Sequence, residues 1–197
     1  MREFTINEND KGQRLDKFIQ KTIKGIPASL MYKSIRTKKI KVNRKRAELN
    51  QILALGDTVQ MFLSEDLFSD KITKDELLSV APRLNIVYED ENLLICDKAP
   101  GILVHTGDGD GKESGKGTAN ERNTLIYHIQ AYLAKKGEYD PSMENSFAPA
   151  LCNRIDRNTG GMVISAKNAQ ALRDVNERIK NNDIEFIKYV EVGEEID

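Results

Sequence analysis

One aspartate stands between two arginines in the segment 152–161, which reads Cys-Asn-Arg-Ile-Asp-Arg-Asn-Thr-Gly-Gly. The positive charges of Arg154 and Arg157 favour the ionised form of Asp156 between them. An ionised carboxylate can act as a nucleophile or a base without a metal or a cofactor. The same residues could instead form a charged turn with surface ion pairs, because aspartate is common in turns. The segment by itself leaves both interpretations open.

The composition indicates a soluble, highly charged protein. The 197 residues include 30 Lys or Arg and 31 Asp or Glu, which gives a formal net charge of −1. This length suits one ordinary domain plus a small one. Cys96 and Cys152 lie in apolar runs without metal-ligand spacing, so we expect buried free thiols in a reducing compartment. No early stretch resembles a signal peptide and no apolar run is long enough for a membrane span, so we expect a cytoplasmic protein.

The first sixty residues predict two short helices, strands and a strongly basic surface. Apolar residues spaced by three and four predict a helix that begins near residue 14 and is broken at 25–27, and a second helix follows. Between Lys33 and Arg46 the chain has eight Lys or Arg residues and no acidic one. Such a density could neutralise several phosphates. A merely solvated basic face is the alternative, although solvated faces usually mix signs.

This pattern resembles the small RNA-binding module of the S-four type, which is named for a ribosomal small-subunit protein. The matching segments are Arg-Leu-Asp at 14–16, the basic helix around 32–36, Ile-Lys-Val-Asn at 40–43 and Leu-Gly-Asp at 55–57. Lys38 and Arg44 stand where the family usually has turn glycines, which makes positive backbone dihedrals more costly there. The resemblance implies that residues 1–63 bind RNA. The residues expected to do so are Arg14, Lys33, Arg36, Lys38, Lys39, Lys41, Asn43, Arg44, Lys45 and Arg46.

The rest of the chain predicts a linker and a second domain. Residues 64–83 are polar and mixed in charge, which is typical of a linker. Two strands around an acidic turn are expected over 86–98, helices over 124–133 and 168–179, and a mobile Gly-rich loop over 107–117. That loop lacks the Ser or Thr of a nucleotide-binding loop and the ligand set of a calcium loop. Neither His105 nor His128 has metal-ligand spacing, and we expect His128 on a helix surface.

Three blocks of this second domain resemble the RluA-type pseudouridine synthases. They are Asp-Lys-Ala-Pro-Gly-Ile-Leu-Val-His at 97–105, the segment 153–162 around Asp156, and Ala-Lys-Asn at 166–168. The usual family motif is His-Arg-Leu-Asp-Arg-x-Thr-Ser-Gly, and here Asn153, Ile155 and Gly160 replace its His, Leu and Ser. The resemblance implies an α+β protein, in which a small α/β RNA-binding module precedes a partial mixed antiparallel-sheet catalytic domain of pseudouridine synthase type over residues 84–197.

The resemblance also implies a reaction and its residues. Asp156 would attack the target nucleotide covalently, at the base or at the sugar carbon, after which the uracil detaches, rotates and rejoins through carbon. Arg154 and Arg157 would orient Asp156 or contact phosphates beside the flipped nucleotide, or would only favour the ionised carboxylate. Tyr189, displaced by one position, stands for the active-site tyrosine of the family. No metal or other cofactor is implied, and the implied partner is RNA, with ribosomal large-subunit RNA as the expected substrate.

The family pattern stops before its end in this sequence. The later Thr-Gly-Arg-Thr-His-Gln-Ile-Arg-like block of the family is not found before Asp197, so we expect a chain truncated or divergent at its C-terminus. A sheet without its remaining strands would expose unpaired edges and apolar faces. Two hypotheses therefore stand together: a pseudouridine synthase that uses Asp156, and a non-catalytic RNA-binding protein with a vestigial catalytic portion. A metal-free hydrolase that uses Asp156 is a weaker third, because no second carboxylate or histidine is placed nearby.

Overall fold

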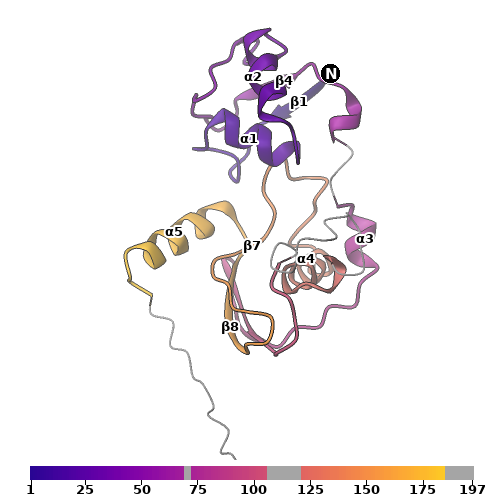
Figure 1. The fold of residues 1–197 in the computed structure, drawn as a ribbon, viewed down its shortest axis with the longest axis vertical. Coiled ribbons are helices and arrows are strands. Elements are labelled where there is room, and N and C mark those ends of the chain that lie inside the picture. Colours follow the sequence, from indigo (N-terminus) through magenta and orange to yellow (C-terminus); the bar gives the residue numbers. More distant parts are fainter. Residues whose placement is uncertain (69–71, 106–120, 185–197) are drawn as a thin grey trace, which may run out of the picture.

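The computed structural model describes residues 1–68, 72–105 and 121–184, and within them two four-stranded antiparallel sheets, each accompanied by helices (Figure 1). In chain order the elements are β1 Arg2–Thr5, α1 Leu15–Thr22, α2 Ala28–Arg36, β2 Ile40–Val42, β3 Lys45–Arg46, β4 Thr58–Met61, the 3-10 helix η1 Glu65–Phe68, α3 Lys74–Leu78, β5 Ile86–Glu89, β6 Leu93–Lys98, the 3-10 helix η3 Glu121–Asn123, α4 Leu125–Lys136, β7 Ala150–Leu151, β8 Gly161–Ala166 and α5 Ala169–Lys180. The Gly-rich loop expected over 107–117 lies outside the described residues.

The N-terminal module, residues 1–63, packs two helices against a sheet of order β1-β4-β2-β3. Alternate residues of the strands face the helices, since Ile40 lies opposite Met61 and Val42 opposite Val59, and all four are buried. The apolar faces of α1 and α2 complete this core, which confirms the helices predicted from the spacing of apolar residues. The α/β character of the module is therefore as expected, and its assignment to the S-four type stays a prediction.

Lys38 and Arg44, which replace the turn glycines of the resembled family, both adopt positive φ angles, 61° and 63°. Lys38 ends α2 in a Schellman motif, in which its N–H bonds the Ile35 carbonyl and the Lys39 N–H bonds the Ser34 carbonyl. Arg44 follows Asn43, also at positive φ (52°), in the two-residue turn between β2 and β3. The backbone thus takes the conformation that glycine favours, while each position supplies a cation.

The segment predicted as a linker is more structured than its composition suggested. Within residues 64–83, η1 and α3 form, and α3 begins with a capping box between Thr73 and Glu76. Phe68 is buried in the core of the N-terminal module, whereas Leu77 is buried in the second core. The polar composition of the segment gave no indication of these two buried side chains. They attach the segment to both parts of the protein.

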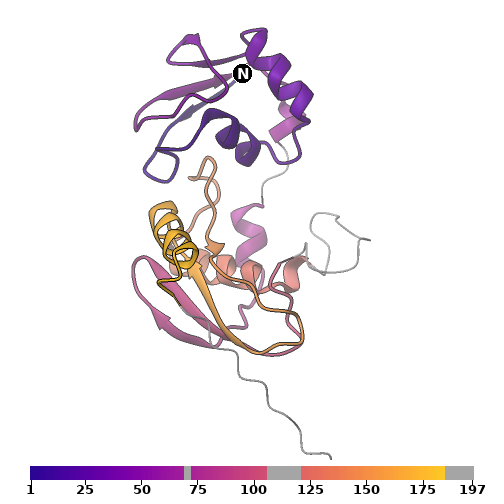
Figure 2. The ribbon, with the colours of Figure 1, turned by 60° about the vertical axis from the view of Figure 1, so that its left-hand side comes forward.

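The second sheet has the order β5-β6-β8-β7 and carries α4 on one face (Figure 2). Leu94, Cys96 and Val163 point into the core that α4 covers. On other positions of these strands Val87 and Met162 are about half exposed, at 53% and 50%. The two strands expected around an acidic turn are confirmed as β5 and β6.

The prediction that His128 lies on the surface of its helix is wrong. His128 is only 6% exposed, and its Nδ1 accepts a hydrogen bond of 3.3 Å from the Arg83 backbone N–H. Burial lowers the pKa of His128, and the charge of Arg83 adds to this effect. α4 contacts α3 on one side as well as the sheet on the other, so residues outside its main apolar stripe are covered too.

The strained turn at Lys38 gives a prediction about stability. Replacing Lys38 by Gly should raise the free energy of unfolding by about 1 kcal/mol, because glycine adopts positive φ without steric cost. Lys38→Ala removes the same charge but keeps the strain, so it should give no such gain. Chemical denaturation of both variants measures the difference, and equal stabilities would contradict the strain argument.

Candidate active site and RNA-binding surface

The loop that carries Asp156 connects β7 to β8 and is closed at its base by Asn153. The Asn153 side-chain amide donates to the Met162 carbonyl (3.1 Å), and its Oδ1 accepts from the Ile164 N–H (2.8 Å). Asn153 therefore extends the pairing of the two strands beyond β7. After Asn153 the chain turns, and the Thr159 N–H bonds the Asp156 carbonyl (3.1 Å). The Asp156 side chain is exposed to solvent.

A buried lysine lies beneath this loop. Lys98 is 1% exposed, and its ammonium group donates to three backbone carbonyls, those of Ala99 (3.1 Å), Ile102 (3.0 Å) and Arg157 (3.0 Å). Burial lowers the pKa of Lys98, and the negative charge of Asp156 opposes that shift. Lys98 is thus a cation within electrostatic range of the candidate nucleophile, and it ties the turn at 99–102 to the loop.

Two further contacts join the same turn to the loop. The Gly101 N–H bonds the Arg157 carbonyl (2.8 Å), and Arg157 Nε donates to the Gly101 carbonyl (3.2 Å). Gly160 lies against the ring of Pro100, where an added β-carbon would lie 3.3 Å from Pro100 Cδ. A side chain at position 160 would therefore force a shift, since so short a contact is rare.

The roles predicted for the other active-site residues stay predictions, and the structure shows where two of these residues lie. Arg157 directs its Nε to a backbone carbonyl of the neighbouring turn, and Arg154 is exposed on the same loop as Asp156. Tyr189 lies outside the described residues. Lys98 had no predicted role, although it belongs to the Asp-Lys-Ala-Pro-Gly block of the family pattern. That block is the signal that could have identified it.

Most of the residues predicted to bind RNA are exposed or half-buried cations of the N-terminal module, and we call them together the basic surface. They come from α2, from β2 and β3, and from the turns that flank them. The members of this basic surface are Lys33, Arg36, Lys38, Lys39, Lys41, Arg44, Lys45 and Arg46. Each of these cations is therefore at least partly accessible to solvent.

Two of the predicted RNA-binding residues, Arg14 and Asn43, make side-chain contacts within the module. Arg14 makes a bidentate ion pair with Asp16, in which its Nε (3.1 Å) and Nη2 (2.9 Å) donate to the two carboxylate oxygens. The Asn43 amide donates to Asp57 Oδ1 (2.8 Å) and accepts from the Thr58 N–H (2.9 Å). Both therefore support the structure of the module.

The sequence analysis missed an aromatic side chain beside the basic surface. Phe62 follows β4 and is 44% exposed, and Lys41 Nζ lies 5.5 Å from the centre of its ring. The Phe62 N–H bonds the Lys39 carbonyl (2.7 Å), which ties the backbone of Phe62 to the turn after α2. An exposed ring among cations can stack on an unpaired base. An apolar residue at the end of a predicted strand gave no signal of this exposure.

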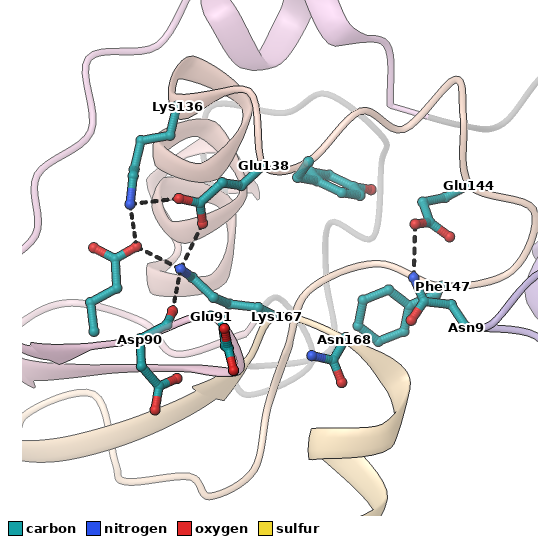
Figure 3. Close-up of a pocket in the computed structure, with 11 residues that line it drawn as sticks. Asn9, Asp90, Glu91, Lys136, Glu138, Glu144, Phe147, Lys167 and Asn168 are labelled. Atoms are coloured by element: carbon teal, nitrogen blue, oxygen red, sulfur yellow. Dashed lines mark hydrogen bonds and ion pairs between the residues drawn. The ribbon is translucent and has the colours of Figure 1, made fainter.

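A cavity of about 680 Å³ opens elsewhere, between the two parts of the chain (Figure 3). Its charged lining consists of Glu89, Asp90, Glu91, Glu138, Glu144, Lys136 and Lys167. Lys167 Nζ bonds Glu89 and Glu138 and the Asp90 carbonyl, as the dashed lines in Figure 3 show. Burial alone would raise the pKa of Glu89, but hydrogen bonds from Lys136, Lys167 and Tyr132 outweigh it and hold the value at about 2.

This cavity is unsuited to RNA, because its carboxylates outnumber its ammonium groups and would repel phosphate. Asp156 is not among its lining residues. The described residues contain no group of three or more His, Cys, Asp or Glu that could hold a metal ion. Burial raises the pKa of Cys96 to about 12 and that of Cys152 to about 11, so both free cysteines stay protonated.

Comparison with known proteins identifies the family. The sequence profile of the RNA pseudouridylate synthases matches residues 92–192, which include the Asp156 loop and Lys98. The chain belongs to the RNA pseudouridylate synthase family. It is 36% identical, over 85% of its length, to an uncharacterized RNA pseudouridine synthase of Mycoplasma capricolum. It is 33% identical, over 94% of its length, to the ribosomal large subunit pseudouridine synthase C of Buchnera aphidicola.

The chain covers 51% of the Mycoplasma protein and 52% of the Buchnera protein, so it spans about half the length of these relatives. In the described part of the chain, no helix has both the length and the apolar character needed to cross a membrane.

The position of Lys98 gives a prediction for the loop. Replacing Lys98 by Met nearly keeps the length of the side chain but removes one donor from each of three carbonyls, of which, within the described residues, only that of Arg157 is seen to keep another, the Gly101 N–H. The loss should lower the free energy of unfolding by about 3 kcal/mol. Lys135→Met, at an exposed position of α4, should change it by less than about 0.5 kcal/mol. Denaturant titration tests both, and equal small effects would show that Lys98 does not hold the loop.

Proposed function

We propose that this chain isomerises uridine to pseudouridine within structured RNA, with ribosomal large-subunit RNA as the substrate and Asp156 as the nucleophile. The observation that carries the proposal is the loop of the family motif, which presents the exposed Asp156 above the buried Lys98. Family membership supports the reaction, and the name of the Buchnera relative supports ribosomal RNA.

The reaction balances without any added reagent. The Asp156 carboxylate attacks the base or the ribose carbon of the flipped nucleotide, and the bond between N1 of the uracil and the ribose breaks. The uracil rotates, a bond forms between its C5 and the ribose, and the bond to Asp156 breaks, which restores the free carboxylate. The C5 proton is lost while N1 takes up a proton. The product has the same formula as the substrate, so no electron acceptor or second substrate is consumed.

We assign supporting roles to three residues. Lys98 holds the loop through the Arg157 carbonyl and places a positive charge beneath Asp156. Arg157 is fixed against Gly101 and so stiffens the loop, whereas Arg154, exposed on the same loop, would contact a phosphate beside the flipped nucleotide. Tyr189 is proposed as the active-site tyrosine on the sequence pattern alone.

The N-terminal module is proposed to be an S-four-like RNA-binding domain, which brings a structured RNA to the loop. Its basic surface supplies contacts to phosphates, which contribute affinity and position but read little sequence. The choice of the modified uridine must therefore come from geometry and from the site itself.

Pseudouridine mapping tests the nucleophile. Incubation of the chain with ribosomal RNA should yield pseudouridine, and Asp156→Asn should lower the rate at least about a thousandfold, because the amide cannot form the covalent intermediate. Asp174→Asn, on the exposed surface of α5, is the control and should retain full activity. Product formation that survives Asp156→Asn would exclude the mechanism. A wild-type chain that binds RNA and forms no product would instead establish a non-catalytic RNA-binding protein.

Salt-dependent binding tests the basic surface. The triple variant Lys38→Gln, Lys39→Gln, Lys41→Gln should lower the slope of log affinity against log salt by about 3, because three phosphate contacts are lost. A matched triple variant at the exposed residues Lys24, Lys135 and Lys180 has the same net charge and should keep the slope. Equal loss in both triples would show that only net charge matters.

A further inference from the structure

A loop of the synthase-family part reaches across to the N-terminal module. Residues 140–147 leave the end of α4 and extend toward α1, as both views of the ribbon show (Figures 1 and 2). The side chains of Asn7, Asn9, Asp10 and Gln13 in the module bond Glu144, Asn145 and Ser146 in this loop. We call these seven residues the clasp. Parts of the chain about 135 positions apart are thereby joined.

Asp10 is the centre of the clasp. Its side chain is fully buried, and its carboxylate accepts short hydrogen bonds from Asn145 Nδ2 and Ser146 Oγ, both 2.6 Å long. Within the module, the Asn7 N–H donates a long bond of 3.4 Å to this carboxylate, and the positive charge of Lys21 acts on it. A carboxylate that is buried without donors costs several kcal/mol, so Asp10 requires the loop in order to stay buried.

The clasp also reaches the element that follows the nucleophile loop. Asn9 Nδ2 donates to Glu144 (2.8 Å), while Asn9 Oδ1 accepts from the Ala169 N–H (3.0 Å) at the start of α5. α5 directly follows β8, the strand onto which the Asp156 loop runs. A single side chain of the module therefore contacts both the loop at 140–147 and the start of α5, and β8 connects this point to the Asp156 loop at its other end.

We propose that the clasp fixes the distance and direction between the basic surface and Asp156, and so determines which uridine of a bound RNA reaches the nucleophile. This inference rests on the proposed function. Hydrogen bonds are directional, so a polar clasp fixes orientation as well as proximity. A rigid link favours only those RNAs in which the bound element and the target uridine have the matching separation, and disfavours the others.

Small-angle X-ray scattering tests whether the clasp fixes the two parts. The variant Asn145→Ala, Ser146→Ala removes both short bonds to Asp10 and should give a larger radius of gyration and a broader distance distribution than the wild type. Ser142→Ala is the matched control in the same loop, because Ser142 bonds only to Asp140 within it. Asp10→Ala should reproduce the change from the module side. Unchanged scattering in both clasp variants, or a wild type that is already flexible, would overturn the proposal.

RNA footprinting tests the consequence without requiring turnover. On ribosomal large-subunit RNA the wild type should protect two segments, and the clasp variants should retain the segment bound by the module and lose the other, with about tenfold weaker affinity. If scattering changes and the footprint does not, the clasp has no role in placing RNA. If the wild type protects both segments but forms no pseudouridine, the proposed function fails while the role of the clasp stands.

Discussion

The buried ammonium group of Lys98 is the interaction on which the candidate active site depends. The Asp156 loop has little apolar anchorage, since most of its side chains are exposed and Ile155 is the partly buried one that packs on the second core. Its shape therefore comes from backbone contacts to the turn at 99–102, and three of the carbonyls involved meet at Lys98. Burying a lysine is costly, and the cost is offset here by three hydrogen bonds and by the nearby charge of Asp156.

In the proposed mechanism the same arrangement would serve both stability and chemistry. A cation held in place before substrate binds favours a negative charge at Asp156 without later rearrangement. Lys98 is buried, so the effect of its charge on Asp156 is set by the packing of β6 and of the turn at 99–102.

A net charge near zero conceals two surfaces of opposite sign. The N-terminal module collects exposed cations on α2, β2 and β3, whereas the cavity of Figure 3 is lined mainly by carboxylates. Phosphate is attracted by the first surface and repelled by the second. The cavity of Figure 3 is thus not where a nucleotide should bind. In the proposed function, RNA on the basic surface would approach Asp156 along a path that avoids the side of the cavity.

The sequence predicted those features that arise from local periodicity. The apolar spacing in α1, α2 and α5 gave helices close to those observed, and the positive φ angles of Lys38 and Arg44 were implied by the replaced glycines. His128 was misplaced because burial on two sides of α4 depends on α3, which a single helical pattern does not reveal.

Sites built from distant polar residues were not predictable in the same way. The Asn- and Asp-rich turn at 5–12 and the loop at 140–147 carry no periodicity, so nothing in either sequence indicated that Asp10 would meet Asn145 and Ser146. Lys98 was visible only as part of a family block, and its partners are backbone carbonyls, which have no sequence signature.

The segment between the two parts explains how a polar clasp can be stable in water. Individual hydrogen bonds contribute only about 1 kcal/mol each, which would not hold two separate domains together. Phe68 and Leu77 are anchored in the two different cores although only nine positions separate them. This short connection keeps the parts at a high effective concentration, so little entropy is lost when the clasp forms. Tethering thus provides the proximity, and the buried carboxylate of Asp10 selects the one orientation in which its donors are supplied.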